Sequence, residues 1–199
     1  MAQLKELLIE QLQDLLHAET QLTNALPKMA DAANHPKLKE AFEKHLTQTQ
    51  QQVERLRKAF ELLGEDAEPK PCKGMMGLIS EGEETIEEGG EKDPLAADLA
   101  LIAAAQKVEH YEISGYGTAR SLARQLGATD CARLLSHTLG EEESADFLLT
   151  AIADPLIQQA ALEDLGADVN LESVPSETGE KASSAGNRKK MPKREKGAA

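Results

Sequence analysis

The chain of 199 residues has the length of one domain, with 3% aromatic residues and no Trp. Its formal net charge of −13 argues against a specific nucleic-acid partner, because the phosphate backbone repels an acidic surface. The longest apolar stretch near the N-terminus is short and broken by charges, so we expect neither a signal peptide nor a membrane span.

The first half of the chain predicts a helical hairpin. Residues 2–33 and 36–63 both carry apolar residues at steps of three and four, which is the period of an amphipathic helix. Asn34-His35-Pro36 separates the two helices, and Pro36 is well placed near a helix start. Gly64 provides the C-terminal stop of the second helix.

A long connection follows, over residues 65–92. It is long enough to cross the length of a helical bundle. One apolar stretch within it predicts a short helix that caps the bundle and needs no ligand to explain it: Met75, Met76, Leu78 and Ile79.

The second half of the chain repeats the hairpin pattern. Residues 94–126 and 129–160 have the same amphipathic period, and Asp93-Pro94 is a typical N-cap and first turn. Each of the four helices has about 30 residues and is therefore about 45 Å long. Two hairpins joined by one long crossover predict an all-α fold of the ferritin-like four-helix-bundle type.

We expect the bundle to occupy residues 1–162 and a disordered tail to occupy 163–199. The tail is rich in Gly, Ser, Pro and charge, with little to bury. It contains seven basic and seven acidic residues, so the net charge belongs to the bundle. The basic residues gather near the end, over 188–196, and predict either non-specific electrostatic contacts or a solubilising tail without a dedicated partner.

Four glutamates interrupt the apolar faces of the helices near mid-length: Glu19, Glu109, Glu112 and Glu142. Glu19 lies about 15 residues before the first hairpin turn, and Glu112 lies about 15 residues before the second turn. Glu112 therefore faces Glu142 across the second hairpin. All four therefore come to one level of the bundle. Carboxylates are rarely buried unless they are paired or bind metal, so this level is the candidate functional site.

Other polar residues are expected at the same level. The inner face of the second helix carries His45 and Thr49, and Asp146 faces Glu109 across the second hairpin. Inward carboxylates and imidazole from facing helices build di-iron and di-manganese sites, and these donors also suit zinc. We therefore predict a dinuclear metal site, with candidate ligands Glu19, His45, Glu109, Glu112, Glu142 and Asp146.

Several short motifs resemble the YciE/YciF group of ferritin-like, stress-inducible bacterial proteins, over about residues 1–160. They are Leu16-His17-Ala18-Glu19, His45 with Thr49, Glu54-Arg55-Leu56, Gly77-Leu78-Ile79-x-Glu81-Gly82, Val108-Glu109-His110-Tyr111-Glu112-Ile113, Tyr116-Gly117, Leu139-x-Glu141-Glu142 and Ala145-Asp146. The resemblance implies a four-helix bundle of the bacterial stress response, and it is much less specific for activity.

The chain departs from the broader ferritin-like pattern, in which the second and fourth helices each carry Glu-x-x-His. The second helix has Thr49-x-x-Gln52 at the expected level, and the fourth has Glu142-x-x-Ala145. The site is therefore either remodelled, with His45 and Asp146 as replacement ligands, or partly lost.

Two classes of function follow. One is a metal-dependent stress protein that binds iron or reduces peroxide; the other is a metal-free helical structural or interaction module. An iron-storage cage is a third option, which the basic tail disfavours. The sequence leaves enzymatic activity open, and we expect a homodimer.

Cysteines and neighbouring residues support a few smaller expectations. Cys72 and Cys131 lie far apart in the sequence, which is typical of reduced thiols in a cytoplasmic protein. Cys72 follows Pro71 in the connection and is a candidate for an exposed, oxidisable thiol.

His17 is expected at the surface. Tyr116 lies on the inner face, where it either packs in the core or acts as a redox neighbour of a metal.

Overall fold

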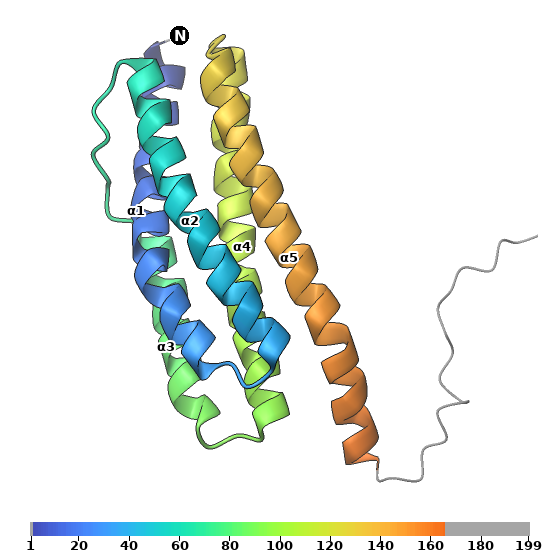
Figure 1. Ribbon diagram of the computed structural model, residues 1–199. Coiled ribbons are helices and arrows are strands. Elements are labelled where there is room, and N and C mark those ends of the chain that lie inside the picture. Colours follow the sequence, from blue (N-terminus) through green and yellow to red (C-terminus); the bar gives the residue numbers. More distant parts are fainter. Residues whose placement is uncertain (1, 166–199) are drawn as a thin grey trace, which may run out of the picture. The chain divides into compact units, whose positions relative to one another are not determined.

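The computed structural model describes residues 2–165, and this part of the chain contains helices and no strands (Figure 1). The helices are α1 (Ala2–Ala32), α2 (Pro36–Leu63), α3 (Lys73–Gly89), α4 (Pro94–Gln125) and α5 (Thr129–Asp164). The predicted all-α, ferritin-like four-helix bundle is confirmed. Most of the predicted tail, residues 166–199, lies outside the described residues.

The four long helices form two antiparallel hairpins, α1–α2 and α4–α5, which pack through α1 on α4 and α2 on α5 (Figure 1). The connection between the hairpins contains α3, as predicted. However, α3 does not cap an end of the bundle. It lies alongside α1 and α4, where its buried Met75 completes the core.

The helix ends follow the sequence signals closely. Gly64 ends α2 at a φ of 70°, a left-handed conformation that glycine adopts without steric cost. The Asp93 carboxylate accepts the N–H of Leu95 at 2.9 Å and so caps α4. The fourth long helix extends four residues beyond its predicted end at 160. Pro155 lies inside this helix, between the buried Ile152 and Leu156.

The interior consists of two apolar clusters with a polar layer between them. The first cluster surrounds Leu26, Phe42 and Leu101, towards the α1–α2 turn. The second surrounds Leu12 and Phe60, towards the opposite end. The buried polar layer contains Glu19, His45, Thr49, Gln52, Glu109, Glu112, Thr138 and Glu142.

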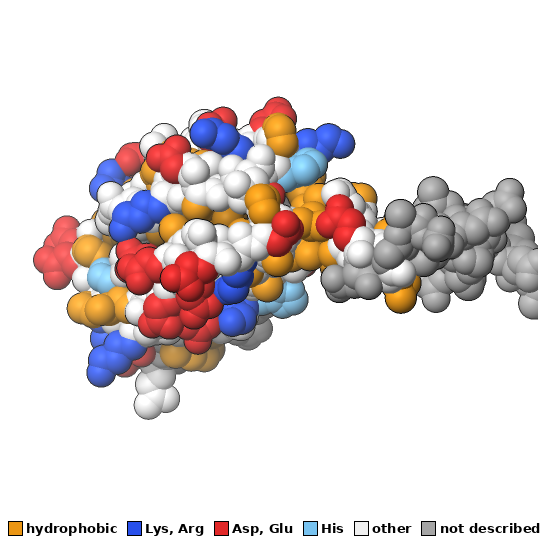
Figure 2. Space-filling view, turned by 90° about the horizontal axis from the view of Figure 1, so that it is seen from below, with side chains coloured by type: hydrophobic (Ala, Val, Ile, Leu, Met, Phe, Trp, Pro, Cys, Tyr) orange, Lys and Arg blue, Asp and Glu red, His pale blue; other side chains and the backbone are white. Residues whose placement is uncertain are grey.

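The surface of the bundle is acidic near the C-terminal end of α3. Figure 2 looks at the end of the bundle that carries the α1–α2 and α3–α4 connections, and it shows Asp and Glu side chains gathered over part of it. Exposed acidic residues in this part of the chain include Glu83, Glu84, Glu87, Glu88 and Glu91. In the described residues, no helix is both long enough and apolar enough to cross a membrane.

One buried carboxylate outside the polar layer holds the first hairpin turn against α4. The Oδ1 atom of Asp98 accepts the backbone N–H of Asn34 at 2.8 Å, and its Oδ2 accepts that of His35 at 2.8 Å. Asp98 is only 3% exposed. These two donors precede α2 and have no partner in a helix, so the carboxylate supplies the acceptors that the turn itself lacks.

We expect Asp98→Ala to lower the free energy of unfolding by about 2 to 3 kcal/mol, because two charge-assisted hydrogen bonds to the turn are lost. Urea denaturation followed by circular dichroism measures the change. Asp154→Ala, at an exposed position of α5, is the matched control. Equal stability of the two variants would show that the turn does not depend on this contact.

Candidate metal centre

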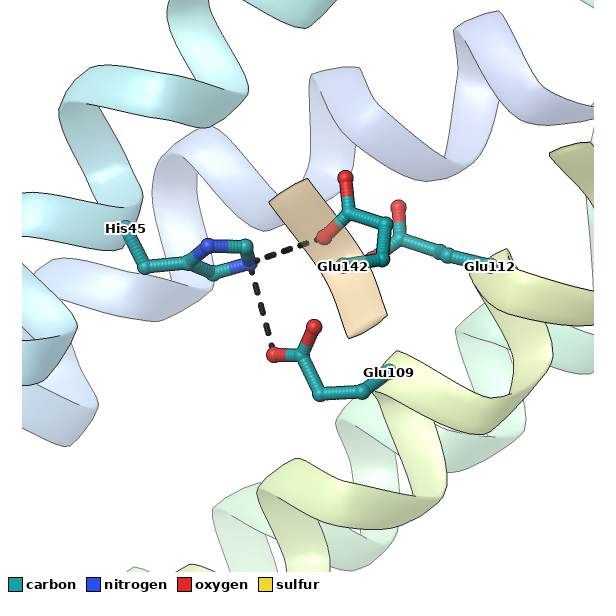
Figure 3. Close-up of side chains that lie close together, drawn as sticks. All are labelled: His45, Glu109, Glu112 and Glu142. Atoms are coloured by element: carbon teal, nitrogen blue, oxygen red, sulfur yellow. Dashed lines mark ion pairs between the residues drawn. The ribbon is translucent and has the colours of Figure 1, made fainter. Parts of the chain in front are cut away.

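Three helices bring one histidine and three glutamates to a common point in the polar layer. His45 comes from α2, Glu109 and Glu112 come from α4, and Glu142 comes from α5 (Figure 3). Each side chain offers one ligand atom, and these atoms all lie within 4.8 Å of one another. All four side chains are buried, so the cluster is shielded from bulk water.

His45 is the centre of two close contacts. Its Nε2 atom lies 3.3 Å from Oε1 of Glu109 and 3.6 Å from Oε2 of Glu142, the contacts drawn as dashed lines in Figure 3. Burial lowers the pKa of His45 to about 4, so the imidazole is neutral near pH 7 and does not form ion pairs there. Neighbouring ligands of one metal lie about 3 to 3.4 Å apart when each bond is about 2.1 Å long. The shorter contact has this spacing.

Glu19 of α1 lies in the same polar layer, beside this group. It is fully buried, and its Oε1 atom accepts a hydrogen bond from the Tyr116 hydroxyl. Its other carboxylate oxygen has no partner. Burial raises the pKa of Glu19, and the negative charge of Glu142 adds to this rise. Glu19 is not one of the four residues whose ligand atoms lie within 4.8 Å of one another.

Asp146 lies outside the group. Its Oδ1 atom is 3.3 Å from Nε2 of the exposed His110 and accepts a hydrogen bond of 3.1 Å from the Gln106 amide. The predicted facing of Asp146 and Glu109 therefore does not bring Asp146 into the cluster. Gln106 and His110 flank Glu109 along α4 but do not belong to the buried polar layer, so Asp146 reaches the level of Glu109 without entering the cluster.

The carboxyl groups of the layer carry more potential charge than their surroundings offset. Burial raises the pKa of Glu109 to about 8, and it raises the pKa values of Glu19, Glu112 and Glu142 well above their usual range. The cation in this part of the bundle is Arg55, which is already paired with Glu141 at 2.7 Å. A bound cation would offset these shifts, because it favours the ionised form of nearby carboxyl groups.

Many buried polar atoms of the layer lack hydrogen-bond partners. They are Glu19 Oε2, both ring nitrogens of His45, Thr49 Oγ1, Gln52 Oε1, Glu109 Oε2, both carboxylate oxygens of Glu112 and Glu142 Oε2. Such groups are normally satisfied, since an unpaired buried polar atom costs about 1 to 3 kcal/mol. The donors are oxygen and imidazole nitrogen, the set that suits iron, manganese and zinc. These residues therefore fit a metal centre.

Gln52 and Arg55 contact the residues around the cluster, a role that the sequence pattern did not predict. Gln52 lies at a motif position, and its amide donates to Glu142 and, at 3.1 Å, to Glu141. Arg55 continues this network by donating to the Thr138 hydroxyl at 2.6 Å. One sequence feature could have predicted this network. Gln52 and Arg55 lie about one turn apart on α2, and Thr138 and Glu141 have the same spacing on α5 across the bundle.

The environment of Cys72 differs from the one expected. Cys72 is fully buried and caps the N-terminus of α3, so the prediction of an exposed thiol is wrong. Its Sγ atom lies 3.0 Å from the Tyr111 hydroxyl, and its N–H donates to Nδ1 of the half-buried His17 at 3.0 Å. Burial raises the pKa of the Cys72 thiol, which disfavours the reactive thiolate.

Stability of the metal-free protein should fall as the pH rises from 6.5 to 8. The pKa of Glu109 is raised from 4.5 to about 8, so in this window the folded protein binds a proton that the unfolded chain releases. Glu19, Glu112 and Glu142 act in the same direction. His45, whose pKa is lowered from 6.5, opposes this trend only below pH 6.5.

Urea denaturation of chelator-treated protein at both pH values measures the effect, which we expect to be at least about 1 kcal/mol. Glu109→Gln should reduce the pH dependence, whereas the control Glu143→Gln, at an exposed position, should not. A stability that is constant or rises over this window would contradict the assignment of protonated buried carboxyl groups.

Comparisons with known proteins agree with this architecture. The model of a family described as Domain of unknown function (DUF892) matches residues 3–162. Protein YciF of Escherichia coli K12 is 46% identical over 154 residues, which make up 77% of this chain and 92% of YciF.

Solved structures give the same result. The crystal structure of the E. coli stress protein YciF has a TM-score of 0.76 at 43% identity, covering 79% of this chain and 99% of that one. YcfI from Rhodopseudomonas palustris has a TM-score of 0.70 at 41% identity, covering 74% and 92%. A protein of Xanthomonas campestris pv. campestris has a TM-score of 0.59 at 25% identity, covering 80% and 99%. The chain therefore belongs to the DUF892 family and is similar to the stress protein YciF.

Proposed function

We propose that the polar layer holds a dinuclear iron or manganese centre, with zinc as a further metal that the same donors accept. The proposed ligands are Glu19, His45, Glu109, Glu112 and Glu142. Asp146 pairs with His110 instead and is not part of this set. His45 takes the place of a motif histidine, although it comes from one helical turn before Thr49.

The charge of the layer carries the proposal. Four buried glutamates sum to a formal charge of −4 when ionised, and Arg55 is engaged by Glu141. Two divalent cations supply +4 and also coordinate the unpartnered oxygen and nitrogen atoms. Because both the charge and the missing contacts are then offset, two metals account for the layer better than one does.

We further propose a role in defence against peroxide or oxidative stress. A similar E. coli protein is described as a stress protein, which supports a stress role for this chain. Bound iron would supply the redox chemistry. The buried ligands would hold the metals away from bulk water. Gln52 and Tyr116 would orient the carboxylates through their hydrogen bonds to Glu142 and Glu19.

Elemental analysis after ferrous-iron loading and desalting should find about two metals per chain. Glu19→Ala and Glu142→Ala should each lower the metal content and the melting temperature of the loaded protein, because each removes a ligand. Glu143→Ala changes the neighbouring exposed carboxylate and should leave the metal content as it is. Unchanged metal content in both ligand variants would argue against this site.

A metal-free helical module is the second candidate function. It is favoured by the hydrogen bonds from Tyr116 to Glu19 and from Gln52 to Glu142, and by the raised pKa values, which together allow a protonated carboxyl cluster to persist. In this case no metal is recovered after loading, chelation leaves helicity unchanged, and Glu19→Ala stabilises the fold by removing a buried acid. The loading experiment therefore separates the two candidates.

We also propose that the protein is a cytoplasmic homodimer. Both cysteines are free and buried, which supports a reducing compartment. Phe147 of α5 is 74% exposed, and the exposed Ile157 lies on the same helix. Exposed apolar side chains on one helix suit a contact between two copies.

Light scattering coupled to gel filtration should give twice the mass of the chain, and Phe147→Glu should shift the equilibrium to the monomer because it places a charge in the contact. Glu143→Ala, on an exposed position of the same helix, is the control. A monomeric wild type, or a dimer that is insensitive to Phe147→Glu, would exclude this surface.

A further inference from the structure

A small pocket between α2 and α5 leads to the candidate metal centre. Its lining includes His45 and Glu109 at the inner end and Ala41, Ala145 and Leu148 nearer the surface. Its volume of about 50 Å³ admits only a few water-sized molecules. The fully buried Glu19, Glu112 and Glu142 do not line this pocket, so it opens on one side of the centre only.

Ala145 contributes only a methyl group to the lining of this pocket. It follows Glu142 by three positions on α5, where the ferritin-like pattern has the histidine of Glu-x-x-His. An imidazole at this position would extend towards His45 and Glu109. The methyl group of Ala145 leaves that space empty, and it removes one protein ligand from the side of the centre that faces the pocket.

Buried atoms at the inner end of the pocket lack partners. Both ring nitrogens of His45 and Oε2 of Glu109 form no hydrogen bond. The two side chains are 5% and 3% exposed. Their unpartnered atoms are therefore available to a ligand that enters through the pocket or binds at the centre. A site that lacks one protein ligand keeps a coordination position for an external molecule.

We infer that Ala145 keeps one coordination position open beside His45, and that the α2–α5 pocket is the route by which a ligand of two or three heavy atoms reaches it. This inference rests on the proposed metal centre. It adds the side from which an external ligand enters, the size of that ligand, and the residue that determines both. The pocket is also lined by the exposed Lys44, the half-buried Gln48 and Glu141, whose carboxylate is paired with Arg55. Its small size and these polar groups favour a small polar molecule over a bulky apolar one.

The test uses the full chain loaded with cobalt(II), whose visible absorption reports coordination, and azide as the small ligand. Azide should change the spectrum of the wild type. Ala145→His should bind the same number of cobalt ions, show a changed spectrum before azide is added, and bind azide about tenfold more weakly, which corresponds to about 1.4 kcal/mol. The added imidazole occupies the open position.

Ala145→Leu separates the route from the ligand position. It should leave the cobalt content and the azide-free spectrum unchanged, because leucine does not coordinate metal, and it should slow azide binding by about tenfold as it fills the pocket. Ala145 is only half-buried, so α5 tolerates both changes. Ala151→His and Ala151→Leu, at an exposed position of the same helix, are matched controls and should behave as the wild type does.

The possible results distinguish the two proposals. If cobalt binds and azide reacts equally with the wild type and both Ala145 variants, the pocket is not the route and this inference is overturned, while the metal centre stands. If the wild type binds no cobalt, iron or manganese, the metal centre itself is wrong and the inference fails with it.

Discussion

The burial of four glutamates at one level of a helical bundle is the constraint on which the structure of this protein depends. Between two apolar clusters, a carboxylate can remain only if it is protonated, hydrogen-bonded or bound to a cation. Arg55 is committed to Glu141, and His45 is neutral near pH 7, so the layer contains no free positive charge of its own among the described residues. The carboxyl groups of the layer must therefore either keep their protons or receive a cation from outside, and a bound metal would supply that charge.

The surrounding residues meet part of this requirement and leave the rest open. Tyr116 and Gln52 each donate to one oxygen of a glutamate, which orients Glu19 and Glu142 without offsetting their charge. Glu112 receives no hydrogen bond at either oxygen. Partial satisfaction of this kind is costly for a purely structural core but useful for a ligand set, because coordinating atoms must keep free lone pairs.

The departures from the ferritin-like pattern change the site unequally on its two sides. On α2, the loss of the motif histidine is compensated in space, since His45 reaches the cluster from the preceding turn. On α5, Ala145 has no such replacement, because Asp146 turns towards His110 and Gln106. The cluster thus receives an imidazole from α2 but only Glu142 from α5, and both His45 and Ala145 line the pocket beside it. Membership of the DUF892 family does not by itself predict this asymmetry.

The sequence by itself determined the four long helices, their hairpin pairing, the long crossover and the level of the buried glutamates. These features follow from local rules: a 3.6-residue period, caps such as Asp93 and Gly64, and a fixed rise per residue that places side chains along a helix axis.

The tertiary structure alone decided which neighbours meet across helices. Periodicity places His45 and Asp146 on a helix face, but it does not fix the direction in which each side chain points. In the packed bundle, His45 points into the cluster, whereas Asp146 contacts His110 outside it. The burial of Cys72 likewise depended on α3 lying along α1 and α4, a docking that local sequence does not encode.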